Sequence, residues 1–179
     1  MKKYQMLING VQTDPASGEW FESINPFTAK PWALVPKGTN DDVDRAVGAA
    51  KTAFHEGKWP SLTASERGSL LRRFGDLLAA EAESIAKLET TDNGKLFAEM
   101  RNQITYIPQW FYYFGGLADK IEGRVIPIDK RGVFNFTRDE PLGVIAAITP
   151  NGSSRVKLKI PRLSSGITRP SILSASPPK

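Results

Sequence analysis

The stretch best suited to chemistry is an apolar run near residue 145 that ends in Thr149 and Pro150. Val144–Ile148 is rich in β-branched residues and follows Gly143, which predicts a strand buried on both faces, as in a parallel sheet. A buried helix segment is the alternative, but five residues are too few for a helix. Because open α/β sheets bind ligands just beyond the carboxyl ends of their strands, we predict cofactor binding at Ile148, Thr149 and Pro150.

The composition excludes several kinds of catalytic and metal site. The 179 residues include no cysteine, so neither disulfides nor a thiolate nucleophile are possible. The single histidine, His55, leaves no Cys/His set for zinc and is more typical of a surface position than of a catalyst. No apolar run reaches the ~18 residues of a membrane span, and residues 1–5 lack the apolar core of a signal peptide. We therefore expect a cytoplasmic protein with no membrane contact.

The basic charge of the chain is concentrated at its carboxyl end. The formal net charge is +5, and residues 151–179 contribute six Lys and Arg and no acid, which leaves −1 for residues 1–150. Residues 155–160 alternate basic and apolar side chains, a pattern of an edge strand or a nucleic-acid arm, and residues 164–179 have the composition of disorder. A nucleic-acid function would depend on this tail alone, so we rank it last.

Short strands and then helices must position the apolar run. Tyr4–Ile8 is a predicted strand that enters an Asn-Gly turn at residues 9–10. Trp20–Ile24 and Trp32–Val35 are predicted strands of the same small sheet. Thr39 begins a helix whose early aspartates complement the helix dipole, a better interpretation than a cation site. One face of this helix should meet a core: Val43, Ala46, Val47, Ala50 and Phe54.

Two further helical stretches complete the predicted core. Thr63 and Glu66 have the spacing of a capping box, and the helix that they begin should break near residues 80–83 and end at a left-handed cap, Asn93-Gly94. The next predicted helix is Leu96–Leu117. Its extra aromatic residues predict packing on two sides rather than a stacking platform for bases. We expect Pro108 to kink or restart this helix.

A hairpin pattern precedes the apolar run. A Gly-containing turn at residues 129–132 has apolar side chains on both sides, which predicts a hairpin at about 124–138. These side chains are Val125, Ile126 and Ile128 before the turn and Val133, Phe134 and Phe136 after it. Its apolar faces indicate contact with another part of the protein or with another subunit.

Together, these motifs resemble the N-terminal part of an aldehyde dehydrogenase. No single motif is decisive, but the ordered set over about 150 positions is highly specific. The matching pieces, in order, are Ile8-Asn9-Gly10, Asn25-Pro26-Phe27-Thr28, Val35-Pro36-Lys37-Gly38, Asp42–Val47, Ala49–Phe54, Glu66-Arg67, Leu88-Glu89-Thr90, Asn93-Gly94-Lys95, Arg138, Glu140–Ile145 and Ile148-Thr149-Pro150.

The resemblance implies an α/β fold, namely an N-terminal fragment of an aldehyde-dehydrogenase-type cofactor-binding domain. This fragment would contain a small β hairpin, three to four helices, part of the oligomerisation hairpin at about 124–138 and the first Rossmann-type strand. Residues 1–150 would form this region, and residues 151–179 would be a basic Ser/Pro-rich tail unrelated to the family pattern. Ile148, Thr149 and Pro150 match positions that line the family's cofactor, NAD or NADP, near its nicotinamide end.

The same resemblance implies that this chain cannot catalyse the family's reaction. That reaction uses a thiolate nucleophile, hydride transfer to the nicotinamide and a Glu-activated water. The chain has no cysteine, and no glycine-bearing turn for the cofactor pyrophosphate is recognisable. In the family Trp-Asn follows the strand and the Asn stabilises an oxyanion, but here Asn151 comes one position early without the Trp, so the role is not carried over.

Two expectations follow from these differences. The first is a truncated, inactive NAD(P)-dependent aldehyde dehydrogenase-like protein that lacks most of the cofactor site. The alternative is a non-enzymatic fragment that associates with itself or with full-length homologous subunits through the hairpin. The change of character after Pro150 suggests that the reading frame or the splice pattern departs from the family there, a hypothesis that the coding DNA would decide.

Overall fold

The structure, a computed structural model, describes residues 1–147 and begins with two small β units. The strand β2 (Met6–Ile8) pairs antiparallel with β3 (Val11–Thr13). The turn between them has φ of 52° at Asn9 and 77° at Gly10, the left-handed values that an Asn-Gly hairpin turn requires. The predicted hairpin is therefore confirmed, although its first strand is shorter than predicted.

The second β unit is a three-stranded sheet with the order β1-β5-β4. The strands β4 (Trp20–Asn25) and β5 (Lys30–Pro36) are antiparallel, and β1 (Lys2–Lys3) pairs parallel with β5. The two later strands were predicted, but they do not share a sheet with β2–β3 as expected. The chain before β2 supplies the third strand instead.

The helices follow in the order and at the places that the sequence predicts. Thr39 and Thr63 form capping boxes, the break falls at Glu81, and Gly94 ends a helix with φ 74°. The helical elements are α1 (Asn40–His55), the 3-10 turn η1 (Trp59–Ser61), α2 (Ala64–Ala80), α3 (Ala82–Asn93) and α4 (Phe97–Leu117).

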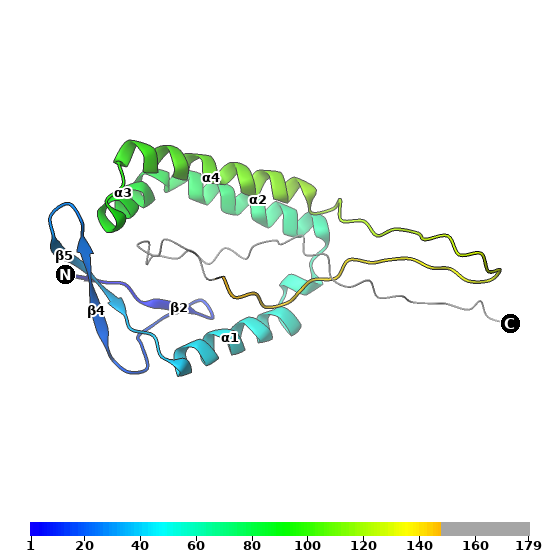
Figure 1. Ribbon diagram of the computed structural model, residues 1–179, viewed down its shortest axis with the longest axis horizontal. Helices are drawn as coiled ribbons and strands as arrows, with labels where there is room; N and C mark the ends of the chain where they lie inside the picture. The colour runs from blue at the N-terminus through cyan, green and yellow to red at the C-terminus, as the bar shows by residue number, and fades with distance from the viewer. Residues whose placement is uncertain (148–179) are drawn as a thin grey trace.

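The apolar core lies between α4 and the pair α2 and α3, which run along it in Figure 1. The helices α2 and α4 approach closely where Gly68 faces Gly115, and Phe74 meets Phe111 edge to face with ring centroids 4.9 Å apart. Pro108 is fully buried, and α4 continues through it, so of the two predicted effects, a kink or a restart, the restart does not occur. The other buried apolar residues of this layer are Leu78, Ala82, Ala86 and Met100.

The helix α1 does not pack as the sequence predicts. Its predicted core residues Val43 and Val47 are 58% and 37% exposed, and Asp42 is its only buried residue. The elements that α1 contacts most are η1 and β2, and in Figure 1 it lies apart from α2 and α4. The apolar pattern correctly predicts the helix, but no described helix or strand buries Val43 or Val47.

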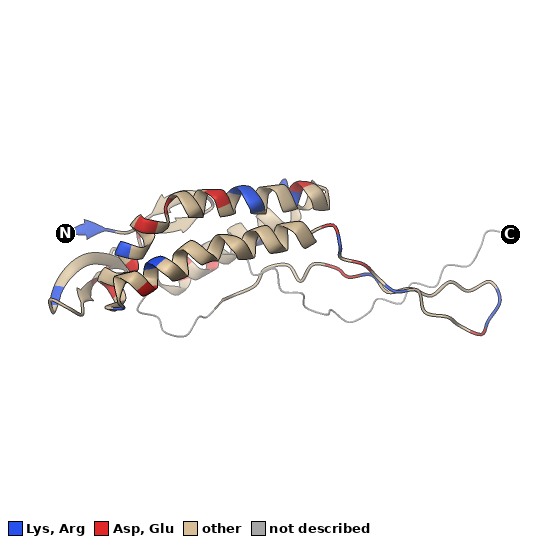
Figure 2. Ribbon diagram, turned by 90° about the horizontal axis from the view of Figure 1, so that it is seen from above, with Lys and Arg blue, Asp and Glu red and all other residues tan. Residues whose placement is uncertain are grey.

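The helix α4 is likewise covered on one side only, which corrects the prediction of two-sided packing. Its outer face carries large side chains at helical spacing that are 38–59% exposed: Tyr106, Trp110, Tyr113, Phe114 and Leu117. Charged residues of α4 are confined to its first turns, and Figure 2 shows the helix that leads into the extended arm as tan over most of its length. The described part of the chain therefore leaves an aromatic face open.

The predicted hairpin at 124–138, here called the arm, projects away from the helices in Figure 1. A single bridge joins Val125 to Phe136, supported by a backbone bond of 2.9 Å from Ile126 N–H to the Asn135 carbonyl. Gly132 has φ 78°, as the predicted turn requires. The two sides of the arm are antiparallel but form almost no ladder.

The strand predicted at Val144–Ile148 is not formed over its described residues, 144–147. Val144 and Ile145 are 39% and 47% exposed. A central strand needs hydrogen-bonding neighbours on both sides, and residues 1–147 offer none here, so the strand prediction is wrong for these residues. Within residues 1–147, no helix combines the length and apolar character needed to cross a membrane.

Candidate functional site

The predicted cofactor residues Ile148, Thr149 and Pro150 lie outside the described residues. The structure does place the segment that leads to them. Gly143 adopts φ 89°, and a Cβ built on it would lie 3.6 Å from Cε1 of Phe54. The approach to the predicted site therefore runs beside the carboxyl-terminal part of α1.

The turn from β5 into α1 shares one feature with phosphate-binding turns, a glycine between a strand and the amino terminus of a helix. A dinucleotide cofactor needs free backbone N–H groups at a helix amino terminus, usually after a glycine-bearing turn. Here Lys37, Gly38 and Thr39 lead from the strand into the helix. Whether this turn fits a phosphate depends on what already occupies the helix terminus.

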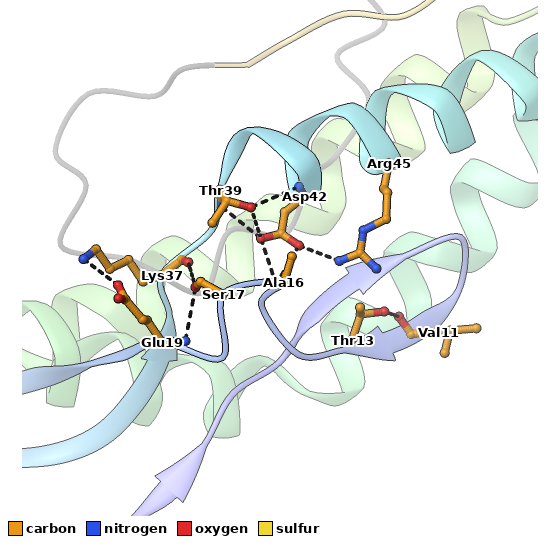
Figure 3. A network of polar contacts seen from close by, with 9 residues as sticks. All are labelled: Val11, Thr13, Ala16, Ser17, Glu19, Lys37, Thr39, Asp42 and Arg45. Carbon is orange, nitrogen blue, oxygen red and sulfur yellow. Dashed lines mark hydrogen bonds and ion pairs between the residues drawn. The ribbon is translucent and has the colours of Figure 1, made fainter.

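The carboxylate of Asp42 occupies the amino terminus of α1. It accepts hydrogen bonds from the backbone N–H of Thr39 at 2.9 Å, from the Thr39 hydroxyl at 3.0 Å and from the backbone N–H of Ala16 at 3.1 Å. Arg45, one turn along the helix, donates to the other side of the carboxylate. Figure 3 shows these groups converging on Asp42 from α1 and from the loop before β4.

This network keeps the Asp42 carboxyl ionised at the amino terminus of α1. The Thr39 backbone hydrogen bond, with smaller contributions from Arg45 and the Ala16 backbone, lowers the pKa of Asp42 from 3.8 to about 2. The carboxylate is therefore ionised at neutral pH, and it repels phosphate while it caps the helix. The described residues do not fit a dinucleotide at this turn, and the network's role is to fix α1 to the loop at residues 14–17.

A second buried polar cluster joins β4 to α3. The Ser23 hydroxyl donates to the Asp92 carboxylate at 2.5 Å, and the Trp32 indole N–H donates to the Ser23 oxygen at 3.2 Å. Ser23 and Asp92 are 4% and 7% exposed. Sequence reasoning missed this cluster, because residues 69 positions apart with no shared motif meet only through packing.

Metal ligands and a nucleophile paired with a base are the remaining arrangements to consider in the described part of the chain. Among residues 1–147, no group of three or more His, Cys, Asp or Glu could hold a metal ion. A shallow depression of about 280 Å³ lies beside Lys87, Thr90, Thr91 and Phe97, but Lys87 is paired with Glu83 at 3.0 Å. It contains neither a nucleophile with a base nor a pair of carboxylates. His55 is exposed, as predicted.

A comparison with known protein families identifies the family to which this fold belongs. A model of the aldehyde dehydrogenase family matches residues 13–153. The chain belongs to this family. A (Z)-2-((N-methylformamido)methylene)-5-hydroxybutyrolactone dehydrogenase of Acinetobacter baylyi is 45% identical over 172 residues, covering 94% of this chain and 35% of the relative. The mitochondrial aldehyde dehydrogenase family 2 member B4 of Arabidopsis thaliana is 44% identical, covering 82% of this chain and 27% of the relative.

Solved aldehyde dehydrogenases have the same fold over this region. The NAD+ complex of the Bacillus cereus enzyme superposes with a TM-score of 0.74 and 35% identity, covering 78% of this chain and 28% of that one. The NAD-dependent enzyme of Sinorhizobium meliloti gives a TM-score of 0.72 and 31% identity, with 77% and 28% covered. The predicted fold, an N-terminal fragment of the aldehyde dehydrogenase cofactor-binding domain, is confirmed.

The chain spans about a third of the length of the curated relatives that it matches. The alignment with the Acinetobacter relative covers 94% of the chain and so extends beyond residue 150, whereas the family model ends at residue 153. The proposed boundary at residue 150 stays a prediction.

Proposed function

We propose that this chain corresponds to the amino-terminal part of an NAD(P)-dependent aldehyde dehydrogenase, which oxidises an aldehyde to a carboxylic acid, and that the 179 residues alone do not catalyse that reaction. The match over residues 13–153 carries the first half of the proposal. The absence of cysteine carries the second, because the family's thiolate nucleophile has no counterpart here. NAD or NADP is the cofactor of the whole protein, and its nicotinamide accepts a hydride when bound.

The contribution of residues 1–147 in this proposal is structural. They supply the helical layer and the small sheet, and they lead the chain past Phe54 towards the predicted cofactor residues at 148–150. The anion-repelling terminus of α1 supports the idea that the cofactor phosphates bind elsewhere in the whole protein. We therefore expect the isolated chain to bind NAD and NADP weakly at most.

The test is an assay of the purified chain with several aldehydes and NAD or NADP, followed by absorbance of the reduced nicotinamide. Calorimetric titration with each cofactor measures binding separately. We expect no turnover, and an intact family enzyme under the same conditions is the positive control. Turnover by the cysteine-free chain would overturn the proposal.

The exposure of the arm's apolar residues favours a second function. In this function the arm associates with an intact homologous subunit or with another copy of the chain. Val125 and Phe134 are 66% and 54% exposed, on a segment that projects from the helices (Figures 1 and 2). Apolar side chains gathered on a projecting hairpin are typical of a subunit contact. The Oδ1 of Asn135, in the same arm, is buried and accepts no hydrogen bond from a described residue.

Size-exclusion chromatography of the chain mixed with an intact homologue tests this association. We expect an earlier-eluting complex that F134D weakens. The matched control is F27D, because Phe27 is 94% exposed at the turn between β4 and β5, away from the arm. An unchanged elution profile on mixing, or equal effects of the two variants, would remove the second function.

A further inference from the structure

Two Asn-Gly dipeptides lie in the described part of the chain, and their surroundings differ sharply. Asn9-Gly10 is the exposed two-residue turn between β2 and β3. Asn93-Gly94 ends α3 and is held on both sides of the peptide bond. Asn-Gly is the dipeptide most prone to deamidation, because glycine has no side chain to obstruct attack by its backbone nitrogen.

We propose that Asn9 is a site of spontaneous deamidation and isoaspartate formation in the native protein, and that the fold protects Asn93 from the same reaction. The Gly10 backbone nitrogen forms a bond to Cγ of Asn9, and the side-chain amide leaves as ammonia. Water then opens the resulting succinimide at either carbonyl, which yields aspartate or isoaspartate. The overall change replaces NH₂ by OH and consumes one water, with no oxidant or further reactant.

The side chain and the attacking nitrogen of the protected dipeptide are both engaged. The Asn93 Nδ2 donates to Glu89 at 3.1 Å, and its Oδ1 accepts from the Lys95 backbone N–H at 2.8 Å. The Gly94 N–H, the nucleophile, donates to the Thr90 carbonyl at 2.9 Å as the cap of α3. Cyclisation at Asn93 must therefore break three hydrogen bonds.

Opening this helix end is also costly because other elements are packed on it. A Cβ built on Gly94 would lie 2.9 Å from Cγ of Pro26, so the loop after β4 is in contact with the cap. The Asn93 amide also lies 3.9 Å from the sulfur of Met100, a residue that is 3% exposed. Freeing the dipeptide requires separation of α3 from α4 and from this loop.

The turn at Asn9 lacks these restraints. Among the described residues, none forms a hydrogen bond with the Asn9 side-chain amide, and a Cβ built on Gly10 would meet no atom within 4 Å. Cyclisation needs a rotation of the Asn9 backbone that a tight turn resists, so its rate follows the opening of the hairpin. Three residue pairs and a 2.7 Å hydrogen bond from the Gln5 side-chain amide to Asp14 hold that hairpin, and Leu7 and Val11 are 71% and 63% exposed. Opening is therefore a local event.

Isoaspartate at this position would disrupt the hairpin. It adds one carbon to the main chain and a negative charge in a turn whose two left-handed residues set the register of Ile8 against Val11. We expect β2 and β3 to separate in the modified protein. Their paired residues, 6–8 and 11–13, would then become more exposed to solvent.

Peptide mapping by mass spectrometry of the full chain, incubated at mildly alkaline pH in buffer and in parallel in concentrated urea, tests the proposal. In buffer we expect Asn9 to convert roughly tenfold or more faster than Asn93, and in urea the two rates to come within a factor of about three, because the difference arises from local opening. Asn151-Gly152 lies outside the described residues and does not enter the comparison.

The variant N9G removes the reactive amide and keeps a residue that tolerates positive φ. It should abolish the mass shift and the isoaspartate at residue 9 and leave conversion at Asn93 unchanged. Equal rates at Asn9 and Asn93 in buffer would overturn the proposal, and so would a tenfold difference that persists in urea, since sequence rather than structure would then set it.

Discussion

Gly115 and Gly116 are neighbours near the end of α4, but only Gly115 touches another helix. A Cβ built on Gly115 would lie 2.7 Å from the Gly68 carbonyl oxygen and 3.0 Å from Cγ of Arg72. A Cβ built on Gly116 would meet no atom within 4 Å. The pair therefore offers a matched test of whether the α2–α4 contact stabilises the fold.

The expected magnitude follows from these distances. The Gly68 oxygen is fixed in the backbone of α2, so G115A must push the helices apart by several tenths of an ångström. Arg72 Nη1 also donates to the Gly115 carbonyl at 2.9 Å, and that hydrogen bond would be strained. Overpacking of this kind costs about 1–3 kcal/mol. The helix-propensity gain from Gly to Ala, up to ~1 kcal/mol, is common to both variants and cancels in their comparison.

Urea unfolding followed by far-UV circular dichroism measures both variants. We expect the free energy of unfolding of G115A to be lower than that of G116A by about 1–3 kcal/mol, and G116A to equal or exceed the original chain. If the two variants agree within ~0.5 kcal/mol, the close contact of α2 and α4 does not stabilise the protein, and our account of the core is wrong.

Three further predictions concern the core and the helix termini. F111A should lower the free energy of unfolding by about 3–5 kcal/mol because Phe111 is 6% exposed, whereas Y113A, at a residue 59% exposed, should change it far less in the same urea titration. T63A should cost about 1 kcal/mol through loss of the α2 cap, and restoration by T63S would separate capping from packing. Because the folded pKa of Asp42 is depressed to about 2 from 3.8, its stabilisation is present above about pH 4 and is lost as the pH falls towards 2. Limited proteolysis with an acid-active protease should show the loop at residues 14–17 being released over that pH window, and D42N, which cannot ionise, should show no such step.

The helix limits were predictable because the signals that set them are local. A threonine whose hydroxyl accepts from the third following N–H begins α1 and α2, and a glycine with positive φ ends α3. The Asn-Gly turn of β2–β3 is local in the same sense. Each of these features depends on a few consecutive residues, so one sequence suffices to find them.

Burial was predicted less well, and the reason is physical. The apolar stripes of α1 and α4 correctly indicated helices, but Val43 and Trp110 are 58% and 52% exposed. A stripe shows that a face is suited to a partner, not that the partner is present in the same chain. The strand expected at residues 144–148 failed over its described part for the same reason, since a strand needs neighbours that residues 1–147 do not supply.

The sequence by itself determined the family, the order of the elements and the absence of a thiolate nucleophile, because these depend on residue identity and short spacing. Only the tertiary structure decided which groups meet: Ser23 with Asp92 across 69 positions, and Asp42 with the backbone of Ala16. It also decided that one Asn-Gly dipeptide is exposed while the other is held by a helix cap and a neighbouring loop. Contacts between distant segments follow from how the elements pack against one another, which no local pattern records.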